Sequence, residues 1–304
     1  MNRPEPHELQ ELQEPHTPGD IEPLATFVDV APGEALALPA ALSRLYGRLT
    51  FPASTGQPYV IGNFVTTLDG VVALGEPDHS GGGAISGFNP HDRMVMGLLR
   101  AVADAVIVGA GTLRADAQHV WTPAHIYPPL TDAYQGLRRS HGMSEQPLTV
   151  IVTAHGELDL DLPVFQSGVA PVLIVTTPPA AARLPQGALP QGTRVVTCGT
   201  PDQQTITARD VLAAVAGALP NSASTSGARF VLEGGPHLMG DFVAESCLDE
   251  LFLTLAPQIA GRDALTHRLG LVEGHRLAPD DPRWGRLVSL KQAGDYLFLR
   301  YAMS

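Results

Sequence analysis

Short apolar runs separated by Gly- and Pro-containing turns dominate the sequence from Pro58 onward. Several runs are apolar at successive rather than alternate positions, which is typical of strands covered on both faces of a sheet. Longer stretches with apolar residues at helical spacing lie between them, and this alternation predicts an α/β fold. The runs predicted as strands are 58–67, 103–110, 147–154, 170–177, 193–197, 228–235, 248–257 and 295–303.

Start signals of helices support the same reading. Asn89 followed by Pro90 forms an N-cap and first helical position, which predicts a helix that ends at Val102. Further helices are predicted from Ala208 and from His237. The last two predicted strands have no helix between them, which indicates an antiparallel edge. We therefore expect a mixed, mostly parallel central sheet, flanked by helices on both faces, in one domain over 58–304.

Four parts of the chain do not follow this pattern. Residues 1–22 are rich in Glu, Pro and His, and their few apolar residues predict a disordered or loosely attached tail. Residues 23–57 are expected to form an N-terminal extension with a short helix within 37–51. Segments 122–146 and 178–192 are long and poor in periodic apolar residues; the first is either a lid or dimer contact, or a plain surface loop.

Composition narrows the functional classes. The chain has 19 Lys and Arg residues against 31 Asp and Glu residues, a net charge of -12. This charge disfavours binding to nucleic acids. It favours small phosphorylated ligands that are held by a few local hydrogen-bond donors. The two cysteines show no zinc-site spacing, so no metal and no disulfide framework are expected. The N-terminus lacks the pattern of a signal peptide and no stretch reads as membrane-spanning, so we expect a cytoplasmic protein without a membrane partner.

The segment Val231–Leu238 is the first candidate for chemistry. It reads as a strand, then Gly234 and Gly235, then a helix start, a geometry that presents backbone N–H groups to a phosphate. A turn that merely requires glycine would look the same. Glu233 ends the strand and is expected to point into the crevice where α/β proteins bind ligands. The chain contains neither GxGxxG nor GxxxxGK[ST], so neither standard nucleotide loop is predicted.

Two further strand ends carry polar residues. After the strand at 103–110, Thr112 and Asp116 lie one helical turn apart, and Thr112 either caps that turn or bonds a ligand. After the strand at 58–67, Asp69 lies on a turn next to glycine and has either a structural or a functional role. The glycine-rich stretch 81–87 is costly to order unless a ligand or another backbone comes close.

In this order and spacing, the motifs resemble the reductase domain of riboflavin-biosynthesis deaminase-reductases and its stand-alone relatives, the pyrimidine-reductase or dihydrofolate-reductase-like family. The resemblance runs from about Pro58 to the C-terminus. It is carried by TLDG at 67–70, LLRAVADAVIVGAGTLRAD at 98–116, EGGPHLMGDF at 233–242 and LDELFLTLAPQIAGR at 248–262.

The resemblance implies a dihydrofolate-reductase-like fold, a homodimer, and NADPH-dependent reduction of the ribose of a ribosylaminopyrimidine 5'-phosphate to a ribityl chain, with hydride transfer to C1' and no metal. It implies cofactor contacts from Thr66, Thr112, Asp116, Thr153, Gly234, Gly235, Pro236, His237 and Leu238, with Thr153 and His155 near the adenosine 2'-phosphate. Arg100, Glu233 and Gly82 are the implied substrate contacts, and Glu233 and Asp69 the implied catalytic residues. Arg100 either meets the substrate phosphate or is a surface arginine at a helix end.

The chain also departs from the family. Where the biosynthetic enzymes continue after the cofactor aspartate with a Pro-Leu-Thr-Arg stretch that grips substrate, residues 117–129 read AQHVWTPAHIYPP. Gly82 and Ala84 replace a serine and a tryptophan, and the deaminase motif of HxE with PCxxC is missing. Open alternatives are therefore a reductase of another pterin-like or phosphorylated carbonyl or imine, and a dinucleotide-binding relative without turnover. A nucleotide enzyme without redox chemistry is disfavoured by the missing phosphotransfer loop.

Overall fold

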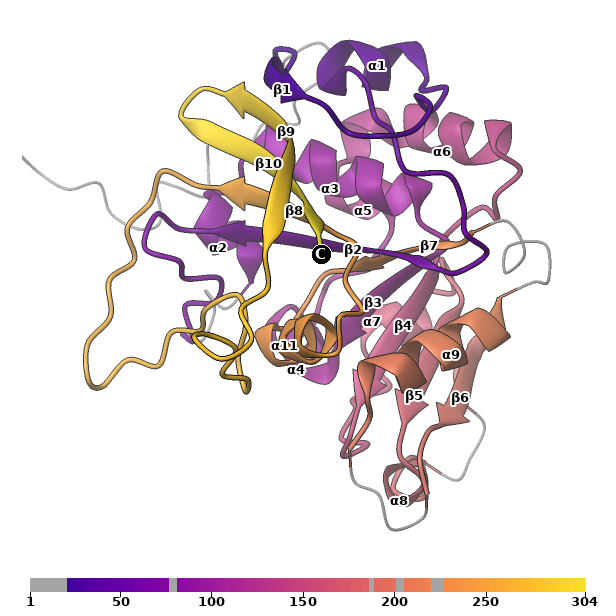
Figure 1. The fold of residues 1–304 in the computed structure, drawn as a ribbon. Coiled ribbons are helices and arrows are strands. Elements are labelled where there is room, and N and C mark those ends of the chain that lie inside the picture. Colours follow the sequence, from indigo (N-terminus) through magenta and orange to yellow (C-terminus); the bar gives the residue numbers. More distant parts are fainter. Residues whose placement is uncertain (1–20, 77–80, 186–188, 201–204, 220–226) are drawn as a thin grey trace, which may run out of the picture.

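A ten-stranded mixed sheet forms the centre of the protein (Figure 1). The computed structural model describes residues 21–76, 81–185, 189–200, 205–219 and 227–304. The strand order is β1-β9-β10-β8-β2-β7-β3-β4-β5-β6; every pair from β8 to β6 is parallel, and β1, β9, β10 and β8 pair antiparallel. The strands are β1 Ala25–Asp29, β2 Tyr59–Thr66, β3 Ala105–Gly109, β4 Leu148–Thr153, β5 Val172–Thr176, β6 Thr193–Thr197, β7 Arg229–Leu232, β8 Glu250–Leu255, β9 Gly285–Ala293 and β10 Tyr296–Met303. The predicted sheet and its antiparallel edge are confirmed.

Helices cover both faces of the sheet, as predicted. They are α1 Ala40–Tyr46, α2 Gly82–Ser86, α3 Pro90–Val102, α4 Ala110–Ala115, α5 Pro123–Ile126, α6 Thr131–Ser140, α7 Pro163–Gln166, α8 Pro178–Ala181, α9 Ala208–Ala218, α11 Pro236–Ala244 and the 3-10 turn Pro128–Leu130. In Figure 1, α1, α3, α5 and α6 lie on one side of the sheet and α9 and α11 on the other. A hydrophobic core lies on each face of the sheet, and strand β3 contributes to both. Its Val106 and Val108 pack on the side of α3, and its Ala105 and Ile107 pack on the side of α9.

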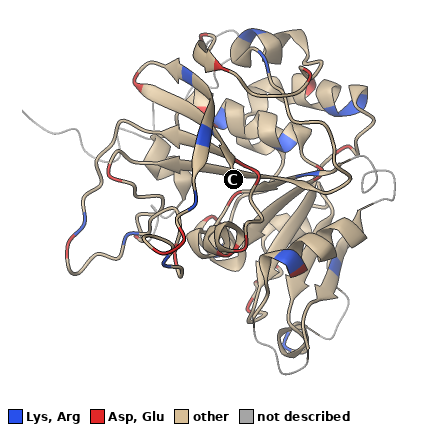
Figure 2. Ribbon diagram, viewed as in Figure 1, with Lys and Arg blue, Asp and Glu red and all other residues tan. Residues whose placement is uncertain are grey.

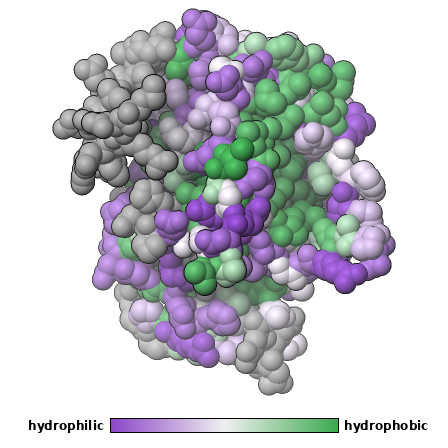
Figure 3. All heavy atoms as spheres, turned by 90° about the vertical axis from the view of Figure 1, so that its left-hand side faces the viewer, coloured by the Kyte–Doolittle hydropathy of each residue, from purple (hydrophilic) through white to green (hydrophobic). Residues whose placement is uncertain are grey.

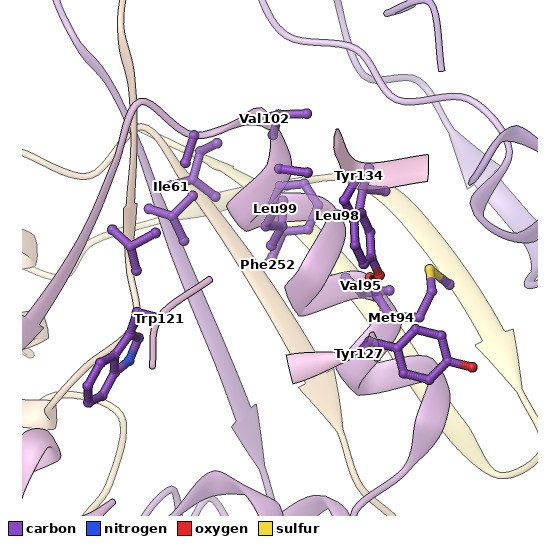
Figure 4. Close-up of a cluster of buried hydrophobic side chains, with 14 of the residues drawn as sticks. Ile61, Met94, Val95, Leu98, Leu99, Val102, Trp121, Tyr127, Tyr134 and Phe252 are labelled. Carbon is purple, nitrogen blue, oxygen red and sulfur yellow. Dashed lines mark hydrogen bonds between the residues drawn. The ribbon is translucent and has the colours of Figure 1, made fainter. Parts of the chain in front are cut away.

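Helix α3 connects the larger core to the site. Its N-cap forms as predicted: the Asn89 side chain accepts hydrogen bonds from the backbone N–H groups of His91 and Asp92, and Pro90 follows. One face of α3 is buried against β2, β8 and α6 (Figure 4), and it carries Met94, Val95, Leu98, Leu99 and Val102. The opposite face is left for the polar residues described below.

The N-terminal extension contains the predicted short helix and an additional strand. Helix α1 lies inside the predicted range 37–51, whereas β1 and β9 were not predicted. Both lie at the antiparallel edge, where β1 is largely exposed, so their sequences lack the continuous apolar runs of the central strands. Of the predicted tail, 1–20 lie outside the described residues, and Ile21 is already buried in the main core.

Segment 122–146 is not a plain surface loop. It folds into α5, the 3-10 turn and α6, and it buries Tyr127, Leu130, Tyr134 and Leu137 against α3. The hydroxyl of Tyr134 donates to the carbonyl of Met94 at 3.0 Å. Prolines and short helices hide the helical period in this stretch, so the sequence pattern misses it. Segment 178–192 begins with α8, and its residues 186–188 lie outside the described residues.

The surface shows two broad features. Figure 2 shows that the described Lys and Arg residues are spread over separate helices, strands and loops. Figure 3 shows hydrophobic patches between hydrophilic ones on the side of the molecule that faces left in Figure 1. Within the described part of the chain, no helix has both the length and the apolar character needed to cross a bilayer.

Arg138 provides a test of how α6 stabilises α3. Its buried guanidinium donates to the carbonyls of Arg100, Ala101 and Ala103 at the end of α3, with a shortest distance of 2.7 Å. Arg138→Met should lower the free energy of unfolding by about 3 kcal/mol, because buried carbonyls lose their donors. Urea denaturation measures the change. The exposed neighbour Arg139→Met is the matched control and should change stability by less than about 0.5 kcal/mol; equal effects would contradict the assignment.

Candidate active site

One cavity of about 770 Å³ lies at the carboxyl ends of β2, β3, β4 and β7. This is the edge at which open parallel sheets bind ligands, because the loops after neighbouring strands diverge there. Helices α2, α3, α4, α5 and α11 contribute the remaining walls. The cavity brings together most of the residues proposed from the sequence: Gly82, Arg100, Thr112, Asp116, Thr153, His155, Glu233, Gly234, Gly235, Pro236, His237 and Leu238.

The double-glycine turn forms one end of this cavity. The backbone N–H of Gly109 donates to the carbonyl of Gly234 at 2.8 Å, which joins the ends of β3 and β7. Gly235 is the N-cap of α11, and Pro236 is its first residue. A Cβ atom would lie 3.0 Å from Thr112 Oγ1 if added to Gly234, whose φ is 123°, and 3.3 Å if added to Gly235. The turn therefore presents bare backbone and the start of a helix to the cavity, a site suited to an anion.

The other end of the cavity lies beyond β4. Thr153 is buried, and its hydroxyl accepts a hydrogen bond from the backbone N–H of Gly156 at 3.1 Å. His155 is exposed beside it. Because β7, β3 and β4 are consecutive neighbours in the sheet, the cavity extends across three strand ends from Gly235 to His155. This elongated form fits a dinucleotide better than a compact ligand.

Arg100 and Glu233 form a buried ion pair in the cavity wall. Arg100 Nε donates to both carboxylate oxygens of Glu233, at 3.0 and 3.1 Å, and Nη2 donates to Oε2 at 2.7 Å. Nη1 donates to the carbonyl of Thr122 at 3.2 Å. The side chains are 2% and 5% exposed, so Arg100 is not a surface arginine. Since its donors already have protein partners, the pair as it stands does not support the expected contact with a substrate phosphate.

Asp92 is a site residue that the sequence reading missed. It is buried in the first turn of α3 and lines the cavity. Burial raises its pKa to about 6, and the negative charge of Glu233 acts in the same direction; hydrogen bonds from the side chains of Thr254 and Ser86 oppose the rise. The carboxyl therefore exchanges its proton close to neutral pH, as a group that handles protons must.

A wall of His119, Trp121 and His125 lies within residues 117–129. The His119 ring lies edge-on to Trp121 and His125, with centroid separations of 5.0 and 4.6 Å. Burial lowers the pKa of His119 to about 2, and the positive charge of Arg100 acts in the same direction, so the imidazole is neutral. Among the described residues, Nε2 of His119 is buried without a hydrogen-bond partner.

Asn63 is a second missed residue, in the middle of β2. It is 8% exposed and lines the cavity, and its Nδ2 is buried without a partner among the described residues. An unpaired buried amide is costly, so a ligand that accepts its hydrogen bond would be favoured. The signal was available in the sequence, because Asn63 is a lone amide in an otherwise apolar strand.

Thr66 and Asp69 are not among the residues that line the cavity. The Asp69 carboxylate accepts hydrogen bonds from the Thr67 hydroxyl and from the backbone N–H groups of Ala260 and Gly261. These bonds, with that from Thr67 the strongest influence, lower the pKa of Asp69 to about 2. The hydroxyl of Thr66 donates to the carbonyls of Thr67 and Val71. These contacts fasten the turn after β2 to the loop after β8 and favour structural roles.

Asp92 gives a pH-dependent prediction. Its pKa of about 6 in the folded protein exceeds the ordinary value of 3.8. Ionised Asp92 therefore lowers the free energy of unfolding above pH 6, and this loss disappears as the pH falls towards 4. Asp92→Asn should raise the free energy of unfolding at pH 8 by up to about 3 kcal/mol. At pH 4 the gain should be much smaller. Denaturation at both pH values measures it, with exposed Asp280→Asn as the control; an equal gain at both would disprove the titration.

Comparison with known proteins places these features in a family. The sequence model described as the RibD C-terminal domain matches residues 58–279. A pyrimidine reductase-like protein from Corynebacterium diphtheriae superposes with a TM-score of 0.60 at 19% identity, covering 86% of this chain and 98% of that one. A riboflavin biosynthesis reductase from Saccharomyces cerevisiae gives 0.51 at 15% identity, covering 83% and 93%.

A two-activity protein is also similar. The diaminohydroxyphosphoribosylaminopyrimidine deaminase/5-amino-6-(5-phosphoribosylamino)uracil reductase from Thermotoga maritima gives a TM-score of 0.55 at 18% identity, covering 82% of this chain. The alignment spans 57% of that protein, little more than half its length. At these identities the structural similarities establish the fold, and the match of the sequence model establishes the family. The chain belongs to the family of the RibD C-terminal domain.

Proposed function

We propose that this protein is an NADPH-dependent reductase of a ribosylaminopyrimidine 5'-phosphate. The observation that carries the proposal is the single cavity that joins a bare double-glycine turn at the start of α11 to a buried Arg100–Glu233 pair and to Asp92. The first feature suits a phosphate-containing cofactor, and the other two provide polar groups where a substrate would react. Membership of the RibD C-terminal domain family supports the same activity.

The cofactor half of the cavity fits a dinucleotide. Backbone N–H groups of Gly235 and of the first turn of α11 would hold the pyrophosphate, with Thr112 beside them. Thr153 and His155 would lie next to the adenosine end, after β4, two strands along the sheet from β7. Bound there, NADPH would supply the hydride at its nicotinamide ring. The protein's own part is to hold ring and substrate face to face and to keep water out.

On the substrate side, we assign the proton to Asp92. Reduction at C1' with opening of the ribose places a proton on the ring oxygen, and a carboxyl with a pKa of about 6 can deliver it near neutral pH. Glu233 fixes Arg100, and the pair is proposed to orient the substrate through its fixed dipole. Gly82 packs closely on β2, since a Cβ there would lie 3.2 Å from Cγ1 of Val65.

We further propose a cytoplasmic homodimer. Large hydrophobic residues are strongly exposed in the loop between β8 and β9, with Leu265 at 95% and Ile259 at 74%. Exposed apolar side chains in a monomer often mark a contact with another chain. The side of the molecule shown in Figure 3 carries hydrophobic patches. Size-exclusion chromatography with light scattering measures the mass directly.

Gly235 provides the test of the cofactor site. Gly235→Asp places a negative side chain at the N-terminus of α11, 3.3 Å from Thr112 Oγ1 at its Cβ, where an anionic cofactor is proposed to bind. It should weaken NADPH binding by about a hundredfold or more. Quenching of tryptophan fluorescence by NADPH measures the affinity. Gly217→Asp, on exposed α9 with open space around it, is the control and should bind normally. Unchanged binding in Gly235→Asp, or none in the unmodified protein, would refute the dinucleotide site.

A second candidate is a reductase of a pterin-like heterocycle, and Asp92 together with Asn63 favours it. A buried carboxylate accepts two N–H groups from a 2-aminopyrimidinone edge, and a free amide donates to a ring oxygen or nitrogen. A uracil edge offers a carbonyl where the amino group would be, and pairs less well with a carboxylate. Asp92 and Asn63 are therefore expected to bind a pterin-like ring more tightly than a uracil ring.

Substrate comparison separates these candidates. NADPH oxidation is followed at pH 7 with a dihydropteridine and with 5-amino-6-(5-phosphoribosylamino)uracil. If the heterocycle is a pterin, Asp92→Asn should lower kcat/KM for it by about tenfold to a hundredfold, because one of two charge-assisted bonds is lost. Turnover of the uracil compound alone would eliminate the pterin candidate and retain the first.

A further inference from the structure

Three arginines line the cavity, and two of them, Arg93 and Arg114, form no ion pair among the described residues. Arg114 is exposed on α4, two residues after Thr112 in the cofactor half, which leaves Arg93 for the substrate half. Arg93 and Arg100 both belong to α3 and both line the cavity. Arg100 is committed to Glu233 and to the Thr122 carbonyl, so its charge is neutralised inside the protein. Seven residues separate the two arginines, which places them two turns or about 10 Å apart along the same face of the helix.

Arg93 is held in place without being neutralised. Its Nε donates to the carbonyl of Ile126 in α5 at 2.9 Å, which fixes the plane of the guanidinium. Within the part of the chain that the structure describes, its two Nη groups have no hydrogen-bond partner and it forms no ion pair. A guanidinium anchored through Nε and free at both Nη atoms is a preorganised fork for an oxyanion.

Two imidazoles and the carboxylates of Asp92 and Asp116 lie near Arg93. The neighbouring wall of His119 and His125 stays uncharged, because burial lowers the pKa of both imidazoles and Arg93 itself adds to the effect. Arg93 is therefore the unpaired cation, among the described residues, that lies beside this wall, whereas Arg114 lies on α4. Asp92, beside it on α3, accepts hydrogen bonds from the side chains of Ser86 and Thr254, and the charge of Arg93 also acts to lower its pKa.

We propose that Arg93, and not Arg100, binds the anionic group of the substrate, a phosphate monoester at the end distant from the reacting carbon. This assignment rests on the proposed function and makes it more specific. It gives the substrate a direction: the heterocycle and the reacting carbon lie towards Asp92 and Glu233, and the phosphate lies towards α5 at the partly exposed end of α3. Arg93 is then the residue that selects phosphorylated over unphosphorylated substrates.

Binding of two small probes tests the assignment. Isothermal titration calorimetry compares ribose 5-phosphate with ribose on the protein alone and on the protein saturated with NADP⁺. The unmodified protein should prefer ribose 5-phosphate, and Arg93→Gln should weaken that ligand by about tenfold or more while leaving ribose unchanged, because only the charge-assisted bonds are lost. Arg93→Lys should retain part of the preference, since an ammonium keeps the charge but not the fork.

Controls separate the possible failures. Arg276→Gln removes an exposed arginine that pairs with Asp280, and it should leave both affinities unchanged. An undiminished preference in Arg93→Gln, equal weakening of both probes, or no preference in the unmodified protein would each overturn the assignment. Failure to bind NADP⁺ would count against the reductase proposal only. The titrations of ribose and ribose 5-phosphate on the protein alone would still test whether Arg93 binds the phosphate.

Discussion

The buried pairing of Arg100 with Glu233 is the interaction on which the site depends. It joins the last turn of α3 to the end of β7 through three short contacts in a setting almost closed to water. A buried charge of either sign would be strongly unfavourable alone, so the two elements are held together at that point. With α3 fixed there, Asp92, Arg93 and Met96 on the same side of the helix lie along the cavity.

The same arrangement distributes the chemistry along one helix. Arg100 lies seven positions after Arg93 and eight after Asp92, so it shares a side of α3 with each of them. One helix thus supplies a carboxyl, an unpaired guanidinium and a paired one to the cavity. The sheet supplies the complementary half: the ends of β7, β3 and β4 present glycine backbone, Thr112 and Thr153. Cofactor and substrate are thus proposed to meet where α3 faces the strand ends.

Residues 117–129, where the sequence differs from the family pattern, lead into segment 122–146, which is built into the core. Its helices pack on α3, Arg138 donates to the carbonyls at the end of α3, and Ile126 orients Arg93. The segment therefore stabilises the helix and shapes the wall of the cavity. A change of substrate contacts in this region is consistent with the proposed reassignment of the phosphate to Arg93.

The sequence by itself determined the α/β class, the central strands, the capped start of α3 and the strand ends at which the cavity lies, because these follow from local apolar runs, glycine turns and an N-cap. It also identified Glu233, Gly234 and Gly235 as cavity residues by their place after a strand. Strands β1 and β9, in the antiparallel part of the sheet, lacked a local sequence signal. Only the tertiary structure showed that Arg100 is paired with Glu233 and that burial raises the pKa of Asp92. It also showed that the Asp69 carboxylate accepts a hydrogen bond from the backbone of Ala260 and so holds a turn in place. Charge, burial and pairing depend on neighbours far apart in the chain, and a linear pattern does not contain them.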